Sequence, residues 1–190
     1  MENKTRCAWC EKDDLYRNYH DNEWGKPVYD DKTIFEFLIL ETFQAGLSWY
    51  TVLSKRENFR KAFDNFDLIK IANYSEEKMN KLAQNPGIIR NKLKIKATIT
   101  NAQAFLKVQK EFGTFSKYIW GFVDGKPIDN QPKNLSEVKA TTPISDALSK
   151  DLKKRGFKFV GSTVVYAHMQ ATGMVNDHVI DCWTRNKNYE

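Results

Sequence analysis

The chain has little cysteine and no long apolar run. Only 3 of its 190 residues are cysteine, which is too few for a disulfide framework, so we expect a reducing compartment. No charged-then-apolar leader and no apolar run of membrane-spanning length are found, so we expect a cytoplasmic protein with no membrane partner. Internal repeats and low-complexity tracts are also lacking. This length suffices for a proper core, so we expect a single domain over residues 1–190, in which two helical lobes with a pocket between them are possible.

Basic residues outnumber acidic ones. The chain has 30 Lys and Arg against 24 Asp and Glu, a formal net charge of +6 and an isoelectric point near 9.1. Such a balance favours an acidic partner, of which nucleic acid is the commonest. Many basic proteins of this size bind no nucleic acid, so the charge needs support from motifs.

Metal-binding side chains stand near both ends of the chain. Cys7 and His20 lie near the start. Near the finish, His178 and Cys182 are one helical turn apart and can point from one face. Two thiolates and two imidazoles form a closed tetrahedral zinc set that would clip both ends together. The spacing leaves an alternative open, because Cys10 offers a competing pair and a buried free cysteine is ordinary core material.

The apolar pattern predicts a mostly helical fold. Helices are expected over residues 31–41, 48–63, 75–86, 89–113, 115–122, 142–155 and 162–172. The first is apolar nearly all round, which indicates a central buried helix, with Asp31 as its cap. The residues between Pro127 and Thr142 are expected to form a polar loop.

The last two predicted helices are joined by a tight hairpin bounded by Gly156 and Gly161. Lys154 and Lys158 lie beside it. Such a hairpin presents backbone N–H groups and a helix N-terminus, which together bind phosphate well. We therefore expect DNA contacts from Lys154, Lys158 and Gly161. The simpler alternative is a basic helix face exposed to solvent.

Glu41 lies at the end of the central apolar helix. It must reach solvent or find a partner, because burying an unpaired carboxylate is costly. The sequence supplies several aromatic side chains for a pocket around it, namely Trp9, Tyr16, Tyr19, Trp24 and Trp49. A pocket of this kind suits a flat cationic ligand, since rings stack on it and a carboxylate accepts its hydrogen bonds. Composition does not exclude that these rings are simply core.

Several long and unusual motifs are spread over residues 6–182. They are RCAW (6–9), YHDNEWG (19–25), LE (40–41), QAGLSW (44–49), PGIIR (86–90), SDALSK (145–150), RGFKFVG (155–161) and VNDH (175–178). Together they resemble the DNA-3-methyladenine glycosylase I family. The resemblance implies an all-α, helix-hairpin-helix DNA glycosylase fold, with one structural Zn²⁺ joining the N- and C-terminal segments. The implied ligands are Cys7, His20, His178 and Cys182.

The resemblance also implies base excision repair. Such an enzyme flips 3-methyladenine out of double-stranded alkylated DNA, hydrolyses its N-glycosidic bond and leaves an abasic site. We expect a monofunctional, monomeric enzyme without lyase activity. Glu41 is implied as the catalytic and base-recognition carboxylate and Trp49 as the ring that stacks on the flipped base. The other implied base-binding positions are Tyr16, Tyr19, Trp9 and Trp24.

Two further positions are interpreted from their place in the chain. Gly46 and Leu47 lie at a tip between two helices, where Leu47 is the candidate wedge for the vacated base stack. An ordinary interhelix contact is the alternative. Asp177 is not expected to act as a base; beside His178 it would orient the metal ligand or cap a helix.

Two other functions stay open at this point. A metal-dependent phosphohydrolase would use the His20-Asp21 and Asp177-His178 pairs, but it needs carboxylate ligands and an open coordination position. A zinc-stapled, non-enzymatic DNA-binding module would need no pocket of aromatic rings around a carboxylate. Metal identity separates the first alternative from a glycosylase, and base release separates the second.

Overall fold

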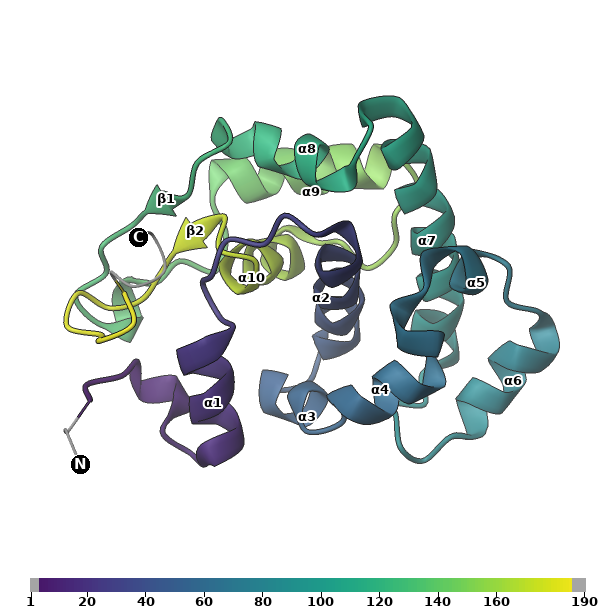
Figure 1. Ribbon diagram of the computed structural model, residues 1–190, viewed down its shortest axis with the longest axis horizontal. Coiled ribbons are helices and arrows are strands. Elements are labelled where there is room, and N and C mark those ends of the chain that lie inside the picture. The colour runs from purple at the N-terminus through teal and green to yellow at the C-terminus, as the bar shows by residue number, and fades with distance from the viewer. Residues whose placement is uncertain (1–3, 186–190) are drawn as a thin grey trace.

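The computed structural model describes residues 4–185, and most of them are helical (Figure 1). The α-helices are α1 (Asp14–Asn22), α2 (Asp31–Gln44), α3 (Trp49–Leu53), α4 (Arg56–Ala62), α5 (Leu68–Ala72), α6 (Glu76–Gln84), α7 (Lys92–Phe112), α8 (Phe115–Trp120), α9 (Pro143–Lys154) and α10 (Ser162–Ala171). The 3₁₀ helices are η1 (Ala8–Cys10), η2 (Asp64–Phe66), η3 (Gly121–Val123) and η4 (Leu135–Glu137). Two short parallel strands pair with each other, β1 (Ile128–Asp129) and β2 (Val175–Asn176).

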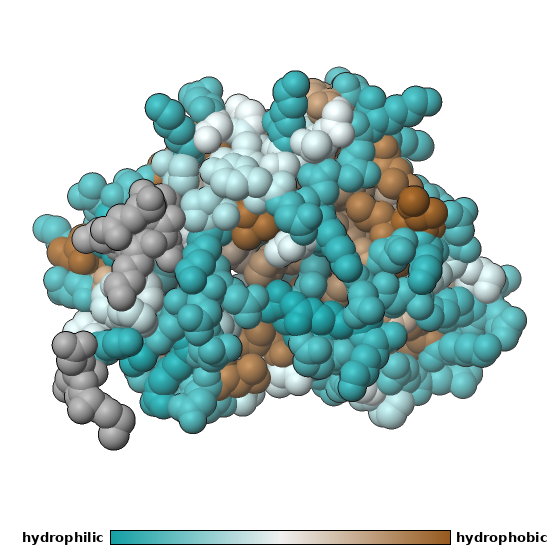
Figure 2. Space-filling view, in the orientation of Figure 1, coloured by the Kyte–Doolittle hydropathy of each residue, from teal (hydrophilic) through white to brown (hydrophobic). Residues whose placement is uncertain are grey.

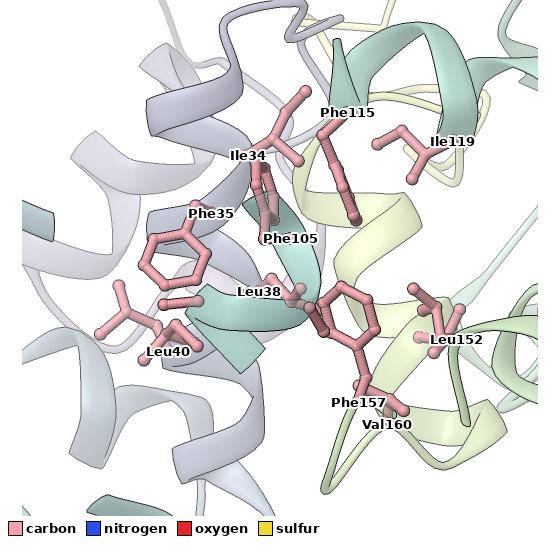
Figure 3. Packing of buried hydrophobic residues seen from close by; sticks show 14 of the residues in the cluster. Ile34, Phe35, Leu38, Leu40, Phe105, Phe115, Ile119, Leu152, Phe157 and Val160 are labelled. Atoms are coloured by element: carbon pink, nitrogen blue, oxygen red, sulfur yellow. The ribbon is translucent and has the colours of Figure 1, made fainter. Parts of the chain in front are cut away.

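Helix α2 forms the centre of the molecule, as its all-round apolar sequence predicts. Every residue from 34 to 43 is buried, and α2 packs against α3, α7, α8 and α10. Figure 3 shows Phe35 and Leu38 of α2 among rings from other elements, including Phe105 and Phe115. The last two rings stack with centroids 3.8 Å apart. Burying a large apolar side chain stabilises the fold by about 1.5–3 kcal/mol, so this cluster fixes α2 firmly.

The cap of α2 is Asp30 and not Asp31, so that prediction was wrong by one residue. The Asp30 carboxylate accepts a hydrogen bond from the Thr33 N–H at 2.9 Å. Asp31 lies inside the helix, and its carboxylate accepts from the N–H groups of Phe115 and Ser116 at 2.8 and 2.7 Å. It thereby satisfies free N–H donors at the start of α8. A long-range partner of this kind cannot be read from local spacing.

Other helix predictions need correction. The helix expected over residues 48–63 is two helices, α3 and α4, which meet at Ser54 and Lys55. Helices α1 and α5 were not predicted. The expected polar loop after Pro127 contains β1 and η4. Strand β1 pairs with β2, which is far away in sequence, so hydrophobic periodicity carried no signal for it.

The surface is largely hydrophilic on the face shown in Figure 2, where smaller apolar areas lie between polar side chains. Within residues 4–185 there is no helix with the length and apolar character needed to cross a membrane. The C-terminal segment returns to the N-terminal one, because the Trp183 N–H donates to the carbonyl oxygen of Thr5 at 3.0 Å. Both ends of the described chain therefore meet on one side of the fold.

Gly173 is tightly confined between α10 and β2. Its φ is +70°, and a Cβ atom there would lie 2.4 Å from the carbonyl carbon of Lys26 and the nitrogen of Pro27. We expect Gly173→Ala to lower the free energy of unfolding by about 2–4 kcal/mol, because backbone must move to admit the methyl group. Urea denaturation measures this. The matched control is Gly121→Ala, whose Cβ meets nothing within 4 Å and whose effect should stay below about 1 kcal/mol. Equal stability of the two variants would contradict the expectation.

Candidate active site and metal cluster

A cavity of about 420 Å³ opens between η1, α1, α2, α3, α10 and the segment around η4. Its volume is in the range of small-molecule sites. All six residues predicted for base binding line it: Trp9, Tyr16, Tyr19, Trp24, Glu41 and Trp49. These side chains come from four separate parts of the chain, and the fold brings them together around one cavity.

Glu41 is the only carboxylate that the central helix places in this cavity. It is 3% exposed, and burial raises its pKa to about 8. Its Oε2 atom has no hydrogen-bond partner among residues 4–185, and neither has Nε1 of Trp49. Buried polar atoms are nearly always hydrogen-bonded, so an acceptor and a donor left open in one cavity indicate a ligand that uses them.

The aromatic rings form two connected walls. The rings of Tyr19 and Trp49 have centroids 5.5 Å apart. Trp9 makes edge contacts with Tyr16 at 4.9 Å and with Trp24 at 5.0 Å. Contacts of this geometry stabilise ring pairs by about 0.5–1.5 kcal/mol beyond burial. The aromatic lining of the cavity is therefore held together by its own ring contacts.

Asp13 fixes the position of Tyr16. Its carboxylate caps α1 by accepting from the Tyr16 N–H at 3.0 Å, and it also accepts a hydrogen bond from the hydroxyl of Tyr50. The rings of Tyr16 and Tyr50 lie 5.4 Å apart. Helix α1 is thereby tied to the residue that follows Trp49, which holds two walls of the cavity together.

Asp177 also lines the cavity, but in another role than predicted. Its carboxylate accepts hydrogen bonds from Tyr166 Oη at 2.8 Å, Gln170 Nε2 at 2.7 Å and Asn130 Nδ2 at 2.7 Å. It neither orients His178 nor caps a helix, so that interpretation was wrong. The three donors come from α10 and from the residue after β1, elements that only the fold brings together.

The four predicted metal ligands form one buried cluster. Their donor atoms all lie within 4.8 Å of one another. Cys182 Sγ lies 3.4 Å from His178 Nδ1 and 3.5 Å from His20 Nε2. Cys7 Sγ lies 3.7 Å from His178 Nδ1. A tetrahedral zinc ion with ordinary bond lengths places sulfur and nitrogen donors about 3.6 Å apart, so the cluster has the dimensions to hold one metal ion.

Cys10 lies outside this set of four. Its thiol donates to the carbonyl oxygen of Cys7 at 3.1 Å, and its side chain is fully buried. The competing Cys7-x-x-Cys10 pair is therefore not the arrangement that the structure assembles. Hydrogen bonds from Cys7 and then from His178 and His20 lower the pKa of the Cys182 thiol far below its usual range.

Both histidines of the cluster use their second nitrogen for a hydrogen bond. Nδ1 of His20 lies 2.8 Å from Oδ1 of Asp21. Nε2 of His178 lies 3.2 Å from the carbonyl oxygen of Trp24. Metal-ligating histidines commonly have a carboxylate or carbonyl partner of this kind, which fixes the tautomer and the ring orientation.

The cluster and the cavity share an aromatic wall. The Trp24 ring lies 4.6 Å from the ring of His178 and stacks on His20 at 6.1 Å. Trp9 makes an edge contact with His20 at 5.3 Å. Because both tryptophans line the cavity, the cluster directly supports one of its walls.

The residues predicted to contact DNA lie on two exposed loops. Gly46, with φ of +81°, and Leu47, which is 43% exposed, form the turn between α2 and α3. Such exposure is uncommon for a side chain that packs two helices together. Lys154 and Lys158 are exposed at the hairpin between α9 and α10, and Gly161 stands directly before α10.

Comparison with known proteins places these features in a family. The family model for methyladenine glycosylase matches residues 9–186. The chain belongs to the methyladenine glycosylase family. It is 52% identical to DNA-3-methyladenine glycosylase 1 of Escherichia coli (strain K12) over 177 residues, which cover 93% of this chain and 95% of that protein.

Solved structures of methyladenine glycosylases agree with this membership. A crystal structure of 3-methyladenine DNA glycosylase I matches with a TM-score of 0.92 and 52% identity, over 94% of this chain and 98% of that one. The enzyme from Staphylococcus aureus, whose structure concerns recognition of 3-methyladenine, matches with a TM-score of 0.92 and 39% identity, over 95% and 96% of the two chains. The mostly helical fold is therefore that of the family.

Sequence reasoning missed part of this methyladenine glycosylase site. The cavity is also lined by Lys133, Asn134, Leu135, Val138 and Lys139, although the polar composition of this segment indicated only a loop. Gln44 and Gln170 line it as well, and only Gln44 lies in a motif that pointed to the site. Asp21 was considered only in the phosphohydrolase alternative; its role as hydrogen-bond partner of His20 could have been predicted, because a carboxylate beside a candidate histidine ligand is a common pairing.

Proposed function

We propose that this chain is a monofunctional DNA-3-methyladenine glycosylase of base excision repair. It hydrolyses the N-glycosidic bond of 3-methyladenine in double-stranded alkylated DNA, releases the free base and leaves an abasic site, without lyase activity. The observation that carries the proposal is Glu41, a buried carboxyl group in an aromatic cavity whose Oε2 atom has no hydrogen-bond partner among residues 4–185. Two relatives, 52% and 49% identical to this chain, are named DNA-3-methyladenine glycosylases.

Recognition of the lesion rests on charge. Methylation at N3 makes the adenine base of the nucleotide cationic. Burial raises the pKa of Glu41 to about 8, which favours its protonated form at neutral pH. A cation within hydrogen-bond reach favours the ionised carboxylate, which then compensates the ligand's charge. Neutral adenine offers no such charge, so it gains less from the same pocket. Stacking on Trp49 and Tyr19 supplies the affinity that is common to both bases.

The reaction needs little acid–base chemistry. The C1′–N9 bond breaks with its electron pair going to the cationic base, which therefore leaves neutral and requires no general acid. Positive charge develops on the deoxyribose, and water adds to C1′ and gives its proton to solvent. Glu41 is the group we assign to stabilise the cationic base and to hold it in line for departure.

Access to the base requires that the nucleotide leave the helix. We assign Leu47 as the wedge that fills the vacated stack and Gly46 as the residue whose positive φ turns the chain there. The hairpin between α9 and α10 is assigned to the phosphate backbone, with Lys154, Lys158 and the N–H groups near Gly161 as contacts.

The metal cluster is assigned to one structural Zn²⁺ held by Cys7, His20, His178 and Cys182. Two sulfur and two nitrogen donors at tetrahedral spacing make a closed set, which ties both chain ends together. A phosphohydrolase site would need carboxylate ligands and an open position, and this donor set supplies neither. The single domain, the monomeric state and the cytoplasmic location stay predictions.

Release of free base tests the proposed function. Methylated duplex DNA is incubated with the protein, and the released bases are separated by chromatography. We expect 3-methyladenine to appear and the DNA strand to break only after alkali treatment of the abasic site. DNA binding without base release would instead support the non-enzymatic module.

A further inference from the structure

Two polar side chains on one face of α7 are buried outside the cavity. Lys94 is 5% exposed and Asn101 is fully buried. Neither takes part in the aromatic site or in the metal cluster. Each forms hydrogen bonds with the backbone of one of the two loops that we assign to DNA contact. Both side chains therefore hold these loops from the protein interior.

Lys94 holds the turn that carries Leu47. Its Nζ donates to the carbonyl oxygen of Phe43 at 2.9 Å and to that of Ala45 at 2.7 Å. These carbonyl groups belong to the C-terminal end of α2, where helical carbonyls lack intrahelical partners. A third carbonyl group at this helix end, that of Gln44, accepts a hydrogen bond from the Leu47 N–H at 2.6 Å. The whole turn between Glu41 and Trp49 is therefore fixed by this ammonium group and by its own backbone.

The position of Lys94 is unfavourable for α7 itself. It lies in the first turn of the helix, where its N–H donates to the Asn91 cap at 3.1 Å. A cation at this end opposes the helix dipole, whereas the same charge at the C-terminal end of α2 is favourable. Burial also lowers the pKa of Lys94. The side chain is therefore placed to serve the turn after α2 and not to stabilise α7.

Asn101 holds the hairpin in a comparable way. Its Nδ2 donates to the carbonyl oxygen of Lys158 at 3.1 Å, and its Oδ1 accepts from the Lys158 N–H at 2.8 Å. Both backbone groups of one hairpin residue are thus paired with a single side-chain amide. The next residue, Phe159, has a φ of +57°, a conformation that needs support in a residue other than glycine.

The two anchors are seven residues apart on α7, which is two helical turns. Residues at this spacing lie on the same face, about 10 Å apart along the axis. Helix α7 packs directly against α2 (Figure 1), so its rigid backbone sets the distance between the turn and the hairpin.

We propose that Lys94 and Asn101 are positioning residues that make α7 a rigid spacer between the two DNA-contacting loops. Lys94 directs the Leu47 wedge into the DNA double helix. Asn101 holds the hairpin between α9 and α10 against the DNA phosphates. This inference rests on the proposed function, because it assumes that both loops meet DNA.

The experiment separates base flipping from DNA binding. Lys94→Met keeps the length of the side chain and removes its donors. Asn101→Asp keeps the acceptor for Lys158 and removes the donor. Three quantities are measured for each variant: the single-turnover rate of 3-methyladenine release at saturating methylated duplex, the Kd for a duplex with an abasic-site analogue, and the Kd for free 3-methyladenine from tryptophan fluorescence.

The two variants should fail in different steps. Lys94→Met is expected to lower the single-turnover rate about tenfold with a nearly native duplex Kd, because loss of hydrogen bonds to a charged donor loosens the wedge. Asn101→Asp is expected to weaken duplex binding about tenfold with a nearly native rate at saturation. Both should bind free 3-methyladenine like the native protein. Lys94→Arg should recover part of the rate, and Lys107→Met, at an exposed position of α7, is the matched control for loss of charge.

The outcomes distinguish the inference from the proposed function. Native rates in Lys94→Met, or free-base binding that falls in parallel with excision, would overturn the assignment and make Lys94 a support of the cavity. If Lys94→Met does not fold, the same comparison is made with Lys94→Leu, which also removes the donors, and a native rate together with a native duplex Kd in that variant overturns the assignment. Failure of the native protein itself to release base would refute the proposed function and this inference with it, whereas the outcomes above overturn the inference alone.

Discussion

Glu41→Gln is expected to lower the rate of 3-methyladenine release at least about a hundredfold while the fold stays intact. Glutamine has nearly the same shape but cannot carry the charge that compensates a cationic base. Removing one preorganised electrostatic group from an enclosed site typically costs two to three orders of magnitude in rate. Single-turnover release from methylated duplex DNA measures the effect directly.

The control for this substitution is Glu57→Gln, because that carboxylate is exposed on α4, away from the cavity. It should leave release unchanged. If Glu41→Gln released base at the native rate, the carboxylate would have no part in recognition or excision. Circular dichroism and metal content of the variant must match those of the native protein for the comparison to hold.

The same substitution should change how stability depends on pH. The pKa of Glu41 rises from an ordinary 4.5 to about 8 on folding, so its protonated form stabilises the native state. That contribution is complete below pH 4.5 and is lost as pH rises through 8. Glutamine cannot ionise, so the variant should gain stability relative to the native protein across this interval, by roughly 3–5 kcal/mol at its upper end. Urea denaturation from pH 5 to 9 shows the sign.

His178→Ala is expected to lose the bound metal ion and several kcal/mol of stability together. The change removes one of four donors, and the metal then no longer joins the returning C-terminal segment to α1. Binding of a structural metal contributes directly to folding free energy, so metal loss and lower melting temperature should coincide. Elemental analysis and thermal unfolding, each with and without a chelator, measure the two quantities.

Cys10→Ser is the matched control, because Cys10 is buried beside the cluster but lies outside it. Its metal content should be native. Loss of metal in this variant would show that Cys10 is a ligand after all. A His178→Ala protein that keeps one metal ion and melts at the native temperature would refute the structural role of the site.

The central features of this protein could be predicted because they are local in sequence. The all-round apolar character of α2 is a property of one segment, and so is the position of Glu41 at its buried end. The resemblance implied the aromatic lining, and the structure places these residues around one cavity. For the metal ligands, residue type indicated the set, but only the distances distinguish Cys7 with its three partners from the Cys10 pair.

The predictions that were wrong concern contacts between distant elements. Asp31 looked like a local cap, yet its partners lie at the start of α8. Asp177 stands next to a metal ligand in sequence, yet its three donors come from α10 and the residue after β1. Short polar side chains can serve many partners, and their neighbours in sequence do not reveal which partner the fold provides.

The aromatic wall between the metal cluster and the cavity has a thermodynamic consequence. Trp24 contacts His178 and also lines the cavity, so on the proposed function the free energies of metal binding and base binding are expected to be linked through this ring. Such coupling is reciprocal: if the metal tightens binding of the base by some factor, the base tightens retention of the metal by the same factor. If the cluster holds a metal ion as proposed, a protein depleted of that metal is expected to bind the lesion more weakly as well as to unfold more easily.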